Sequence, residues 1–240
     1  MALSEKEKLV NFLKSSLKDK SAILGVSSGI DSSLVLMLLT LSIPKEKIMP
    51  IFLPESSVSQ NDLNDIIALE KASGIKIKTV YIENIIKAYS NLLEIKDMKS
   101  LGNVKSRIRM TVLYYYANIN SGMVVGTTNL TEYITGYFTK FGDGGCDIEP
   151  IIGLTKTKVR ELSAEVGVPE SIIKKPPSAG LWKDQTDEKE LGFSYSLIDE
   201  EVDYFIRNGS FEENHVGKRV KSLYEASMHK RTLPVGPEKD

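Results

Sequence analysis

The chain has 240 residues and nearly balanced charge, with 31 lysines and arginines against 32 aspartates and glutamates. We expect no nucleic-acid partner, because there is no basic excess. One cysteine, Cys146, excludes a disulfide framework and a four-cysteine zinc site, and two histidines leave little for a histidine-rich metal centre. The polar start lacks a signal-peptide core, and the longest apolar run, residues 34–39, is too short to cross a bilayer. We therefore expect a cytoplasmic protein with no membrane partner.

Strands and helices are predicted to alternate through the first half of the chain, from the spacing of its apolar residues. Helices are expected over residues 3–18, 31–43, 59–72, 83–95 and 103–119, with a polar connection over 96–100. Strands are expected over residues 22–24, 48–54, 76–82 and 123–126, the second of them short or beginning after Pro50. This alternation predicts an α/β fold, a doubly wound and mostly parallel sheet with helices on both faces. We expect a single domain over residues 1–240, with 176–240 as an appended, mostly helical region.

A turn rich in serine and glycine, residues 25–33, follows the first predicted strand. Its N–H groups and hydroxyls at a helix N-terminus suit an anion, yet Asp31 places a carboxylate there. A divalent cation resolves the conflict, because Mg²⁺ takes oxygen from both carboxylate and phosphates. The lysine of a Walker loop is absent. The alternative is a turn whose polar residues only cap the following helix.

The turn resembles the Ser-Gly-Gly-x-Asp-Ser loop of N-type ATP pyrophosphatases, which cleave ATP between its α and β phosphates. Ser28 departs from that pattern, because it stands where the family usually has its first glycine. A serine fits there only if its backbone φ stays negative or the turn tolerates mild strain.

A second polar segment, residues 126–132, follows the fourth predicted strand. Asn129 with Glu132 three residues later is a capping-box pattern, so Glu132 has an interpretation that needs no ligand. Residues 136–147 then hold two acids, one lysine and four glycines. This composition is too irregular for a helix or strand core and is typical of a loop that brings its backbone close to a ligand.

At this point the chain resembles ammonia-dependent NAD synthetases. The matching segments run in order through nearly the whole sequence: residues 25–33, 102–110, 126–132, 138–145, 154–156, 177–179, 187–192 and 229–231. Phe-Thr-Lys-Phe-Gly-Asp-Gly-Gly at 138–145 is the most specific of them. Gly180 departs from the family, which usually carries an acid at that position.

The resemblance implies a set of site residues. ATP would be bound by Gly25, Val26, Ser27, Ser28, Gly29, Ile30, Asp31, Ser32, Thr127, Lys156 and Ser178. Deamido-NAD would be held by Arg107, Lys140, Asp147, His229 and Lys230. Asp31 and Glu132 would ligate Mg²⁺, and Asp31, Lys156 and Asp143 would be catalytic.

Two of these positions carry a structural expectation of their own. Lys156 follows Thr155, which suits a helix N-cap, so its side chain should be free to reach a phosphate. The alternative is a solvated lysine in the first helical turn, although the helix dipole disfavours a cation there. Arg107 and Arg109 are two residues apart on a helix, so we expect at most one to meet the substrate and the other to be a surface charge.

The implied reaction adenylates the nicotinate carboxylate of deamido-NAD with ATP, and ammonia then displaces AMP. The resemblance also implies a homodimer. Other readings stay open: another N-type ATP pyrophosphatase, acting in GMP synthetase-like amidation or tRNA thiolation, or a non-catalytic nucleotide-binding module. Thiolation usually needs paired cysteines and a basic surface, and both are missing. We expect no hydrolysis of glutamine, because Cys146 lies in the glycine-rich loop with neither histidine near it in sequence.

Overall fold

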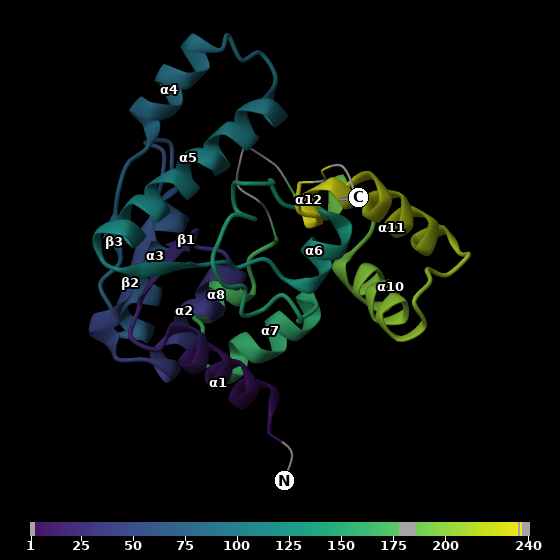
Figure 1. Cartoon of the computed structure of the whole chain (residues 1–240), viewed down its shortest axis with the longest axis horizontal. Helices are drawn as coiled ribbons and strands as arrows, with labels where there is room; N and C mark the ends of the chain where they lie inside the picture. The colour runs from purple at the N-terminus through teal and green to yellow at the C-terminus, as the bar shows by residue number, and fades with distance from the viewer. Residues whose placement is uncertain (1–2, 178–185, 235, 237–240) are drawn as a thin grey trace.

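The computed structural model describes residues 3–177, 186–234 and 236. Within them, four parallel strands form one sheet in the order β3-β2-β1-β4 (Figure 1). The strands are β1 (Ser21–Val26), β2 (Ile48–Phe52), β3 (Lys78–Thr79) and β4 (Gly122–Val125). Because β1 lies between β2 and β4, the segments that leave β1 and β4 emerge side by side at the carboxyl edge of the sheet. Ligands of such sheets bind at this kind of crevice.

Helices cover both faces of the sheet, as predicted. Alternate residues of β1 point to opposite faces: Leu24 packs with the helices of one face and Ile23 with those of the other. The first face is covered by α1 (Glu5–Leu17), α2 (Ile30–Ser42), α3 (Gln60–Ser73), α7 (Lys156–Glu165) and α8 (Glu170–Ile173). The second is covered by α4 (Glu83–Leu92) and α5 (Met98–Ile119), which extend away from the sheet in Figure 1.

A third apolar cluster lies beside the sheet and is built mainly from the C-terminal part of the chain. It contains Tyr195, Ile198 and Val202 of one helix and includes Ile134 from the segment that follows β4. Its helices are α6 (Leu130–Thr135), α9 (Asp187–Leu191), α10 (Tyr195–Asn208) and α11 (His215–Ala226), followed by α12 (Met228–Arg231). The C-terminal helices are thus packed on the segment that leaves β4.

Two of the predicted elements differ most from the structure. The third strand was expected over 76–82 but spans only Lys78–Thr79, at the edge of the sheet. The long helix begins at Met98 rather than 103, because Asp97 caps it by accepting a hydrogen bond from Ser100 N (2.7 Å). Pro50 lies inside β2, which is tolerated because β3 pairs with β2 only from Ile51 onward.

The described part of the chain contains no helix with the length and apolarity needed to cross a membrane.

Candidate active site

The turn after β1 is held by its own serines at the start of α2. Ser27 N donates to Ser32 Oγ (3.2 Å), and Ser33 Oγ donates to the carbonyl of Gly29 (2.8 Å). Gly29 is the N-cap of α2, and no side chain accepts a capping hydrogen bond from this helix. The backbone N–H groups of its first turn therefore point toward the carboxyl edge of the sheet without a capping partner. This is the geometry of an anion site.

Ser28 adopts the left-handed conformation, with φ 61°. A serine was expected here only with a negative φ or with mild strain in the turn. The expectation of a negative φ is wrong, and the backbone is therefore strained at Ser28. The Ser28 side chain is almost fully buried and donates to Asp62 Oδ1 (2.8 Å).

Three charged side chains from three helices meet at this edge. Lys156 Nζ lies 2.6 Å from Asp31 Oδ2 and 3.3 Å from Glu132 Oε1. The Lys156 side chain is only 3 % exposed, so the solvated alternative for this lysine is wrong. Asn129 adds a fourth group, because its Nδ2 donates to Asp31 Oδ1 (2.8 Å). The two predicted metal ligands and the predicted phosphate-binding lysine thus form one cluster.

The charges in this cluster are strongly coupled. Burial and the neighbouring Asp31 carboxylate raise the pKa of Glu132, against the opposite effect of Lys156. Burial lowers the pKa of Lys156, but the Asp31 and Glu132 carboxylates outweigh it, so this pKa lies above its usual value. One ammonium therefore serves two carboxylates, whose side chains are each 17 % exposed.

Glu132 also has the structural role that the sequence offered as an alternative. Its Oε2 accepts from Asn129 N (3.2 Å), and Glu132 N donates to Asn129 Oδ1 (2.9 Å), which completes the capping box of α6. The other carboxylate oxygen remains directed at Lys156. Capping and charge binding are thus combined in one side chain rather than being alternatives.

The position of Lys156 depends on Asp199, a residue that the sequence reading missed. Lys156 is the first residue of α7, as predicted, but Thr155 makes no side-chain cap. Asp199 of α10 accepts instead from Thr157 N and Oγ1, both at 2.7 Å, and from Thr131 Oγ1 (2.5 Å). Thr131 Oγ1 in turn accepts from Lys156 N (3.1 Å). Helices α6, α7 and α10 are therefore locked together where Lys156 enters the site.

The glycine-rich loop after α6 is fastened to α5. Asp143 Oδ1 accepts from Ser106 Oγ (2.5 Å) and from Thr139 N (3.1 Å), and Asp143 N donates back to Ser106 Oγ (2.8 Å). A side chain on Gly142 would place its Cβ 2.3 Å from Ser106 Oγ, so this close approach requires glycine. The predicted catalytic Asp143 is thus held rigidly in place.

Four of the five predicted deamido-NAD residues lie around this loop. Arg107 Nε donates to the carbonyl of Lys140 (3.3 Å), and Lys140 Nζ donates to the carbonyl of His229. Lys230 Nζ donates to the carbonyls of Gly136 and Phe138, both at 2.7 Å. Helix α12 and α5 therefore bracket the loop with basic groups.

Asp147, the fifth predicted deamido-NAD residue, accepts its hydrogen bonds from α5 and β4 and not from the basic side chains around the loop. Its Oδ1 accepts from Tyr114 of α5 (3.2 Å) and its Oδ2 accepts from Val124 N (2.7 Å). Arg109 is not the surface charge expected of it: its Nε donates to the carbonyl of Leu53 (3.1 Å), and burial lowers its pKa.

Thr127 lies on the turn after β4, and Ser178 falls outside the described residues. The turn is supported from behind by Glu149, whose Oε2 accepts from Thr128 N (3.1 Å) and whose Oε1 accepts from Cys146 Sγ (3.1 Å). Burial raises the pKa of Glu149 to about 7. Burial and Glu149 raise the pKa of the Cys146 thiol, so it stays protonated.

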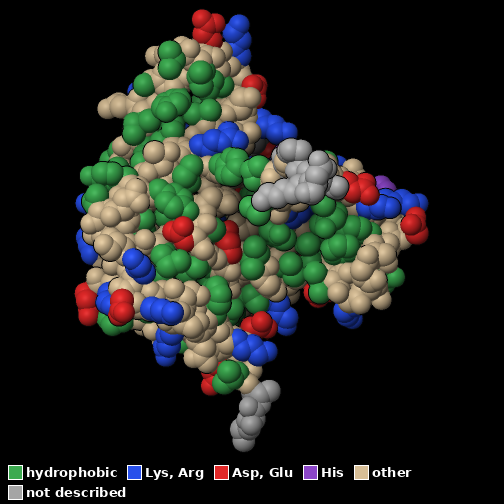
Figure 2. Space-filling model, viewed as in Figure 1, with side chains coloured by type: hydrophobic (Ala, Val, Ile, Leu, Met, Phe, Trp, Pro, Cys, Tyr) green, Lys and Arg blue, Asp and Glu red, His purple; other side chains and the backbone are tan. Residues whose placement is uncertain are grey.

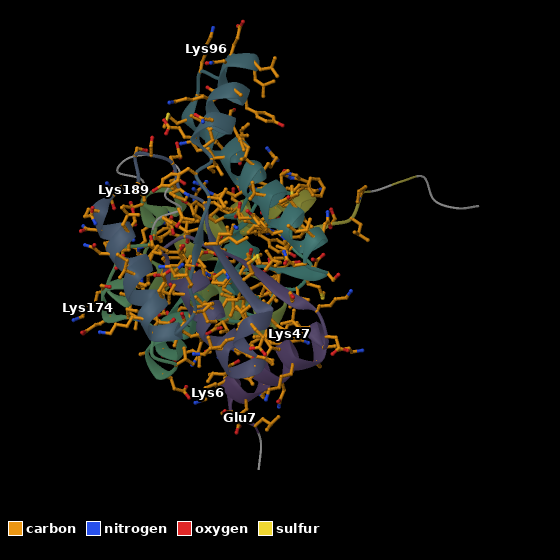
Figure 3. All side chains as sticks on the ribbon, turned by 90° about the vertical axis from the view of Figure 1, so that its left-hand side faces the viewer. Lys6, Glu7, Lys47, Lys96, Lys174 and Lys189 are labelled. Carbon is orange, nitrogen blue, oxygen red and sulfur yellow. The ribbon has the colours of Figure 1, made fainter. Side chains whose placement is uncertain are left out.

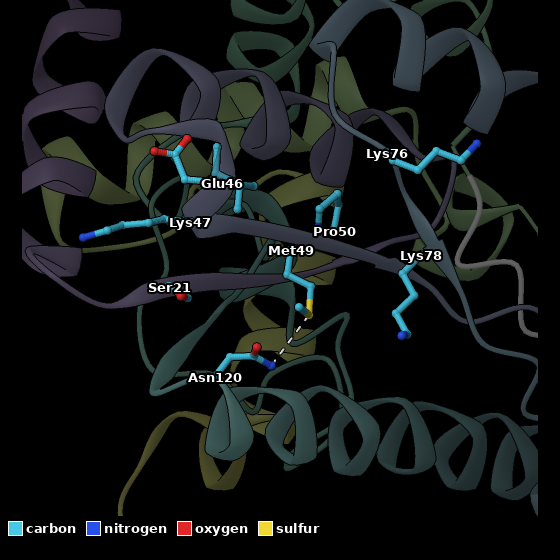
Figure 4. Close-up of a pocket in the computed structure, with 9 residues that line it drawn as sticks. Ser21, Glu46, Lys47, Met49, Pro50, Lys76, Lys78 and Asn120 are labelled. Atoms are coloured by element: carbon cyan, nitrogen blue, oxygen red, sulfur yellow. Dashed lines mark hydrogen bonds between the residues drawn. The ribbon is translucent and has the colours of Figure 1, made fainter.

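A separate hollow lies at the opposite, amino-terminal edge of the sheet (Figure 4). Ser21, Met49, Lys78 and Asn120 are among its lining residues. It shares no residue with the cluster around Lys156, so it is not part of this site.

With this geometry in view, the chain was compared with known proteins. The family model described as NAD synthase matches residues 5–234. The chain belongs to the NAD synthase family. This membership confirms the resemblance found in the sequence and decides against the GMP synthetase-like and thiolating alternatives.

Individual relatives of this family match over nearly their full length. The NH(3)-dependent NAD(+) synthetase of Thermoplasma acidophilum is 46 % identical over 237 residues, covering 99 % of this chain and 98 % of that protein. Among solved structures, NMN synthetase from Francisella tularensis has a TM-score of 0.87 and 33 % identity, covering 99 % and 100 % of the two chains. NH3-dependent NAD synthetase from Campylobacter jejuni, in complex with the nitrate ion, has a TM-score of 0.81 and 27 % identity, with 98 % of each chain covered.

Proposed function

We propose that this chain is an ammonia-dependent NAD synthetase, a ligase that amidates deamido-NAD and converts ATP to AMP and pyrophosphate. The observation that carries the proposal is the meeting of Asp31, Glu132 and Lys156 beside the turn of residues 25–33. A non-catalytic nucleotide-binding module has no use for two partly buried carboxylates aimed at one cation next to a phosphate turn.

Asp31 and Glu132 suit Mg²⁺ as a cofactor that arrives with ATP. Oxygens of both carboxylates lie within 3.3 Å of the same ammonium nitrogen, so they converge on one small space. Among the described residues there is no group of three or more metal-ligating side chains, so phosphate oxygens and water would complete the coordination, as is usual for Mg²⁺. Burial and the Asp31 carboxylate raise the pKa of Glu132, and a divalent cation beside it would favour its charged form. Bound there, the ion would supply charge neutralisation of the departing pyrophosphate.

In the first step, the nicotinate carboxylate attacks the α-phosphorus of ATP. The bond from that phosphorus to the oxygen bridging to the β phosphate breaks, and pyrophosphate leaves. The backbone N–H groups at the start of α2 bind the phosphates, and Lys156 places its ammonium beside them. The Lys156 ammonium lies between the two carboxylates that would hold Mg²⁺, so it would supply positive charge to a phosphate bound beside them.

In the second step, the lone pair of ammonia attacks the carbonyl carbon of the adenylated carboxylate. AMP leaves with the electrons of the broken C–O bond, and the nitrogen loses one proton. Asp143 is the carboxylate we assign to receive that proton, because Ser106 and Thr139 hold it in a fixed position on the loop. Arg107, Lys140, His229 and Lys230 provide the basic surroundings that the phosphates of deamido-NAD require.

The structural similarity to an NMN synthetase supports a second candidate substrate, nicotinate mononucleotide. It carries the same carboxylate on the same ring, so the chemistry at Lys156 and Asp143 is unchanged. The two substrates differ in the adenylate half of the dinucleotide, which only a longer site would bind.

We also propose that the chain acts as a homodimer formed through α4 and α5. Apolar side chains gather on the surface over these helices in Figure 2. Tyr115, Ile119, Tyr89 and Leu92 are exposed by 58 %, 59 %, 48 % and 79 %, and a partner chain would cover them.

One assay tests the function. The purified chain is given ATP, Mg²⁺, ammonium and either deamido-NAD or nicotinate mononucleotide, and AMP, pyrophosphate and the amidated product are measured together. Equal amounts of AMP, pyrophosphate and NAD, with the dinucleotide used far faster than the mononucleotide, are expected. Pyrophosphate release without an amide, or no pyrophosphate with either substrate, would contradict the proposal. Faster use of the mononucleotide would favour the second candidate.

A further inference from the structure

A polar network joins the phosphate turn to two helices that the proposed reaction leaves unused. Lys175 Nζ lies 2.5 Å from Asp62 Oδ1 and 3.0 Å from both Asp65 Oδ2 and Ser28 Oγ. Ser171 Oγ donates to the remaining oxygen of Asp65 (2.8 Å). The network therefore ties the turn to α3, which carries the two aspartates, and to the segment that follows α8.

Ser28 is the member of this network that belongs to the turn. Its φ of 61° is a conformation that glycine adopts freely and that residues with a side chain disfavour. Its hydroxyl both donates to Asp62 and accepts from Lys175, and the residue is only 1 % exposed. The hydrogen bonds thus hold the backbone in a conformation that the residue would otherwise leave.

Lys175 is the only positive charge that the structure's described residues place in this network. Its ammonium neutralises Asp62 and Asp65, which would otherwise repel each other and the phosphates at the turn. Burial raises the pKa of Asp62, but hydrogen bonds from Lys175, Ser59 and Ser28 outweigh it, so this carboxyl is ionised. Without the lysine, Asp62 and Asp65 would lose their shared cation, and Ser28 Oγ would lose one of its two partners.

We propose that Lys175 is a positioning residue for ATP, acting through Ser28 to hold the phosphate turn in its left-handed conformation. The proposal rests on the function proposed above, in which this turn binds the phosphates of ATP. It also gives a role to the serine that replaces a glycine of the family pattern: the chain uses side-chain contacts where a glycine needs none.

The first test is Lys175→Met, with Lys174→Met as the matched control. Lys174 is the neighbouring lysine, points into solvent in Figure 3 and pairs only with Glu170 (2.6 Å) among its described contacts. Lys175→Met should raise the KM for ATP about 10-fold, with the KM for deamido-NAD unchanged and Lys174→Met equal to wild type. Lys175→Arg, which keeps the charge and the donors, should recover most of the ATP affinity.

The second test asks whether the effect passes through Ser28. Ser28→Gly removes the need for the network, so Lys175→Met should have little effect on the KM for ATP in that background. An equal loss in both backgrounds, an equal loss for both substrates, or no loss in the single variant would overturn the proposal. If Lys175→Met does not fold, Lys175→Gln in the two backgrounds decides the same comparison. A wild-type chain that releases no pyrophosphate from ATP would instead refute the proposed function, which separates the two failures.

Discussion

Replacing Glu132 with glutamine separates its two roles. In the capping box, Glu132 Oε2 accepts from Asn129 N, and the carbonyl oxygen of a glutamine can accept the same hydrogen bond. Toward Lys156 and Mg²⁺, the substitution removes a full negative charge. We therefore expect the fold to survive and the chemistry to fail.

The structure sets the size of both effects. Loss of a capping interaction costs about 1 kcal/mol, but glutamine keeps it, and removal of a buried carboxylate with a raised pKa adds stability at neutral pH. The free energy of unfolding should therefore be unchanged or higher. Loss of one of two charged ligands in a charge clamp costs about 10²-fold or more in turnover, corresponding to about 2.7 kcal/mol. Asp31→Asn should behave in the same way.

The chain carries its own control, a second capping box in α1 formed by Ser4 and Glu7. Glu7 is at the surface far from the site, as Figure 3 shows, so Glu7→Gln should leave turnover at the wild-type level. The measurements are steady-state release of pyrophosphate across a range of Mg²⁺ concentrations and chemical unfolding of each variant. Intact turnover with a lowered free energy of unfolding in Glu132→Gln would refute the reasoning and leave capping as its only role.

Three further predictions concern residues around the site. Asp199→Asn should destabilise the fold by about 2 kcal/mol in chemical unfolding, because an amide cannot accept the N–H and two hydroxyl donors that Asp199 now serves. Glu149→Gln should stabilise the fold above pH 7 by up to about 3 kcal/mol and have no effect below pH 4.5. The folded chain binds this proton more tightly than the unfolded chain, so the stability that the proton contributes is lost as pH rises to about 7. Cys146→Ser should leave NAD formation from ammonium unchanged, and glutamine freed of ammonia should support none, because this thiol stays protonated.

Each of these has an outcome that contradicts it. A wild-type unfolding curve for Asp199→Asn would mean that α7 is capped by other groups. A stabilisation by Glu149→Gln that does not depend on pH would point to packing rather than to a buried charge. NAD formation from glutamine alone would give Cys146 a catalytic role that its surroundings argue against.

The sequence predicted the layered fold because its signals are local. Short buried runs, the capping residue Ser59 and the glycine that ends α3 at residue 74 are all visible within a few positions of the chain. The length of the third strand was predicted wrongly because an edge strand has one neighbour, and its length depends on how far it pairs with that neighbour. The first residue of α5 was predicted wrongly because Asp97, its N-cap, was taken as part of a polar connection.

The site was predicted where a motif marks it and missed where partners lie far apart in sequence. Asp31, Glu132 and Lys156 stand in recognisable segments, so their meeting could be expected. Asp199 has no motif, and its partner Thr157 lies 42 residues earlier. The burial of Lys156 could not be predicted either, because it depends on how α10 packs against α7.

Helix α5 contacts both halves of the site, the phosphate turn and the glycine-rich loop. At one position, the Leu113 side chain of this helix lies so close to β1 that a Cβ on Gly25, the first residue of the phosphate turn, would be 3.0 Å from its Cδ1. Two helical turns earlier, Ser106 Oγ donates a hydrogen bond to Asp143 of the glycine-rich loop. In the proposed reaction, the spacing between the phosphate turn and Asp143 would therefore be set by one continuous helix. A side chain on Gly25 would meet only the end of the Leu113 side chain, so the spacing depends on the continuous backbone of α5 and not on this one contact.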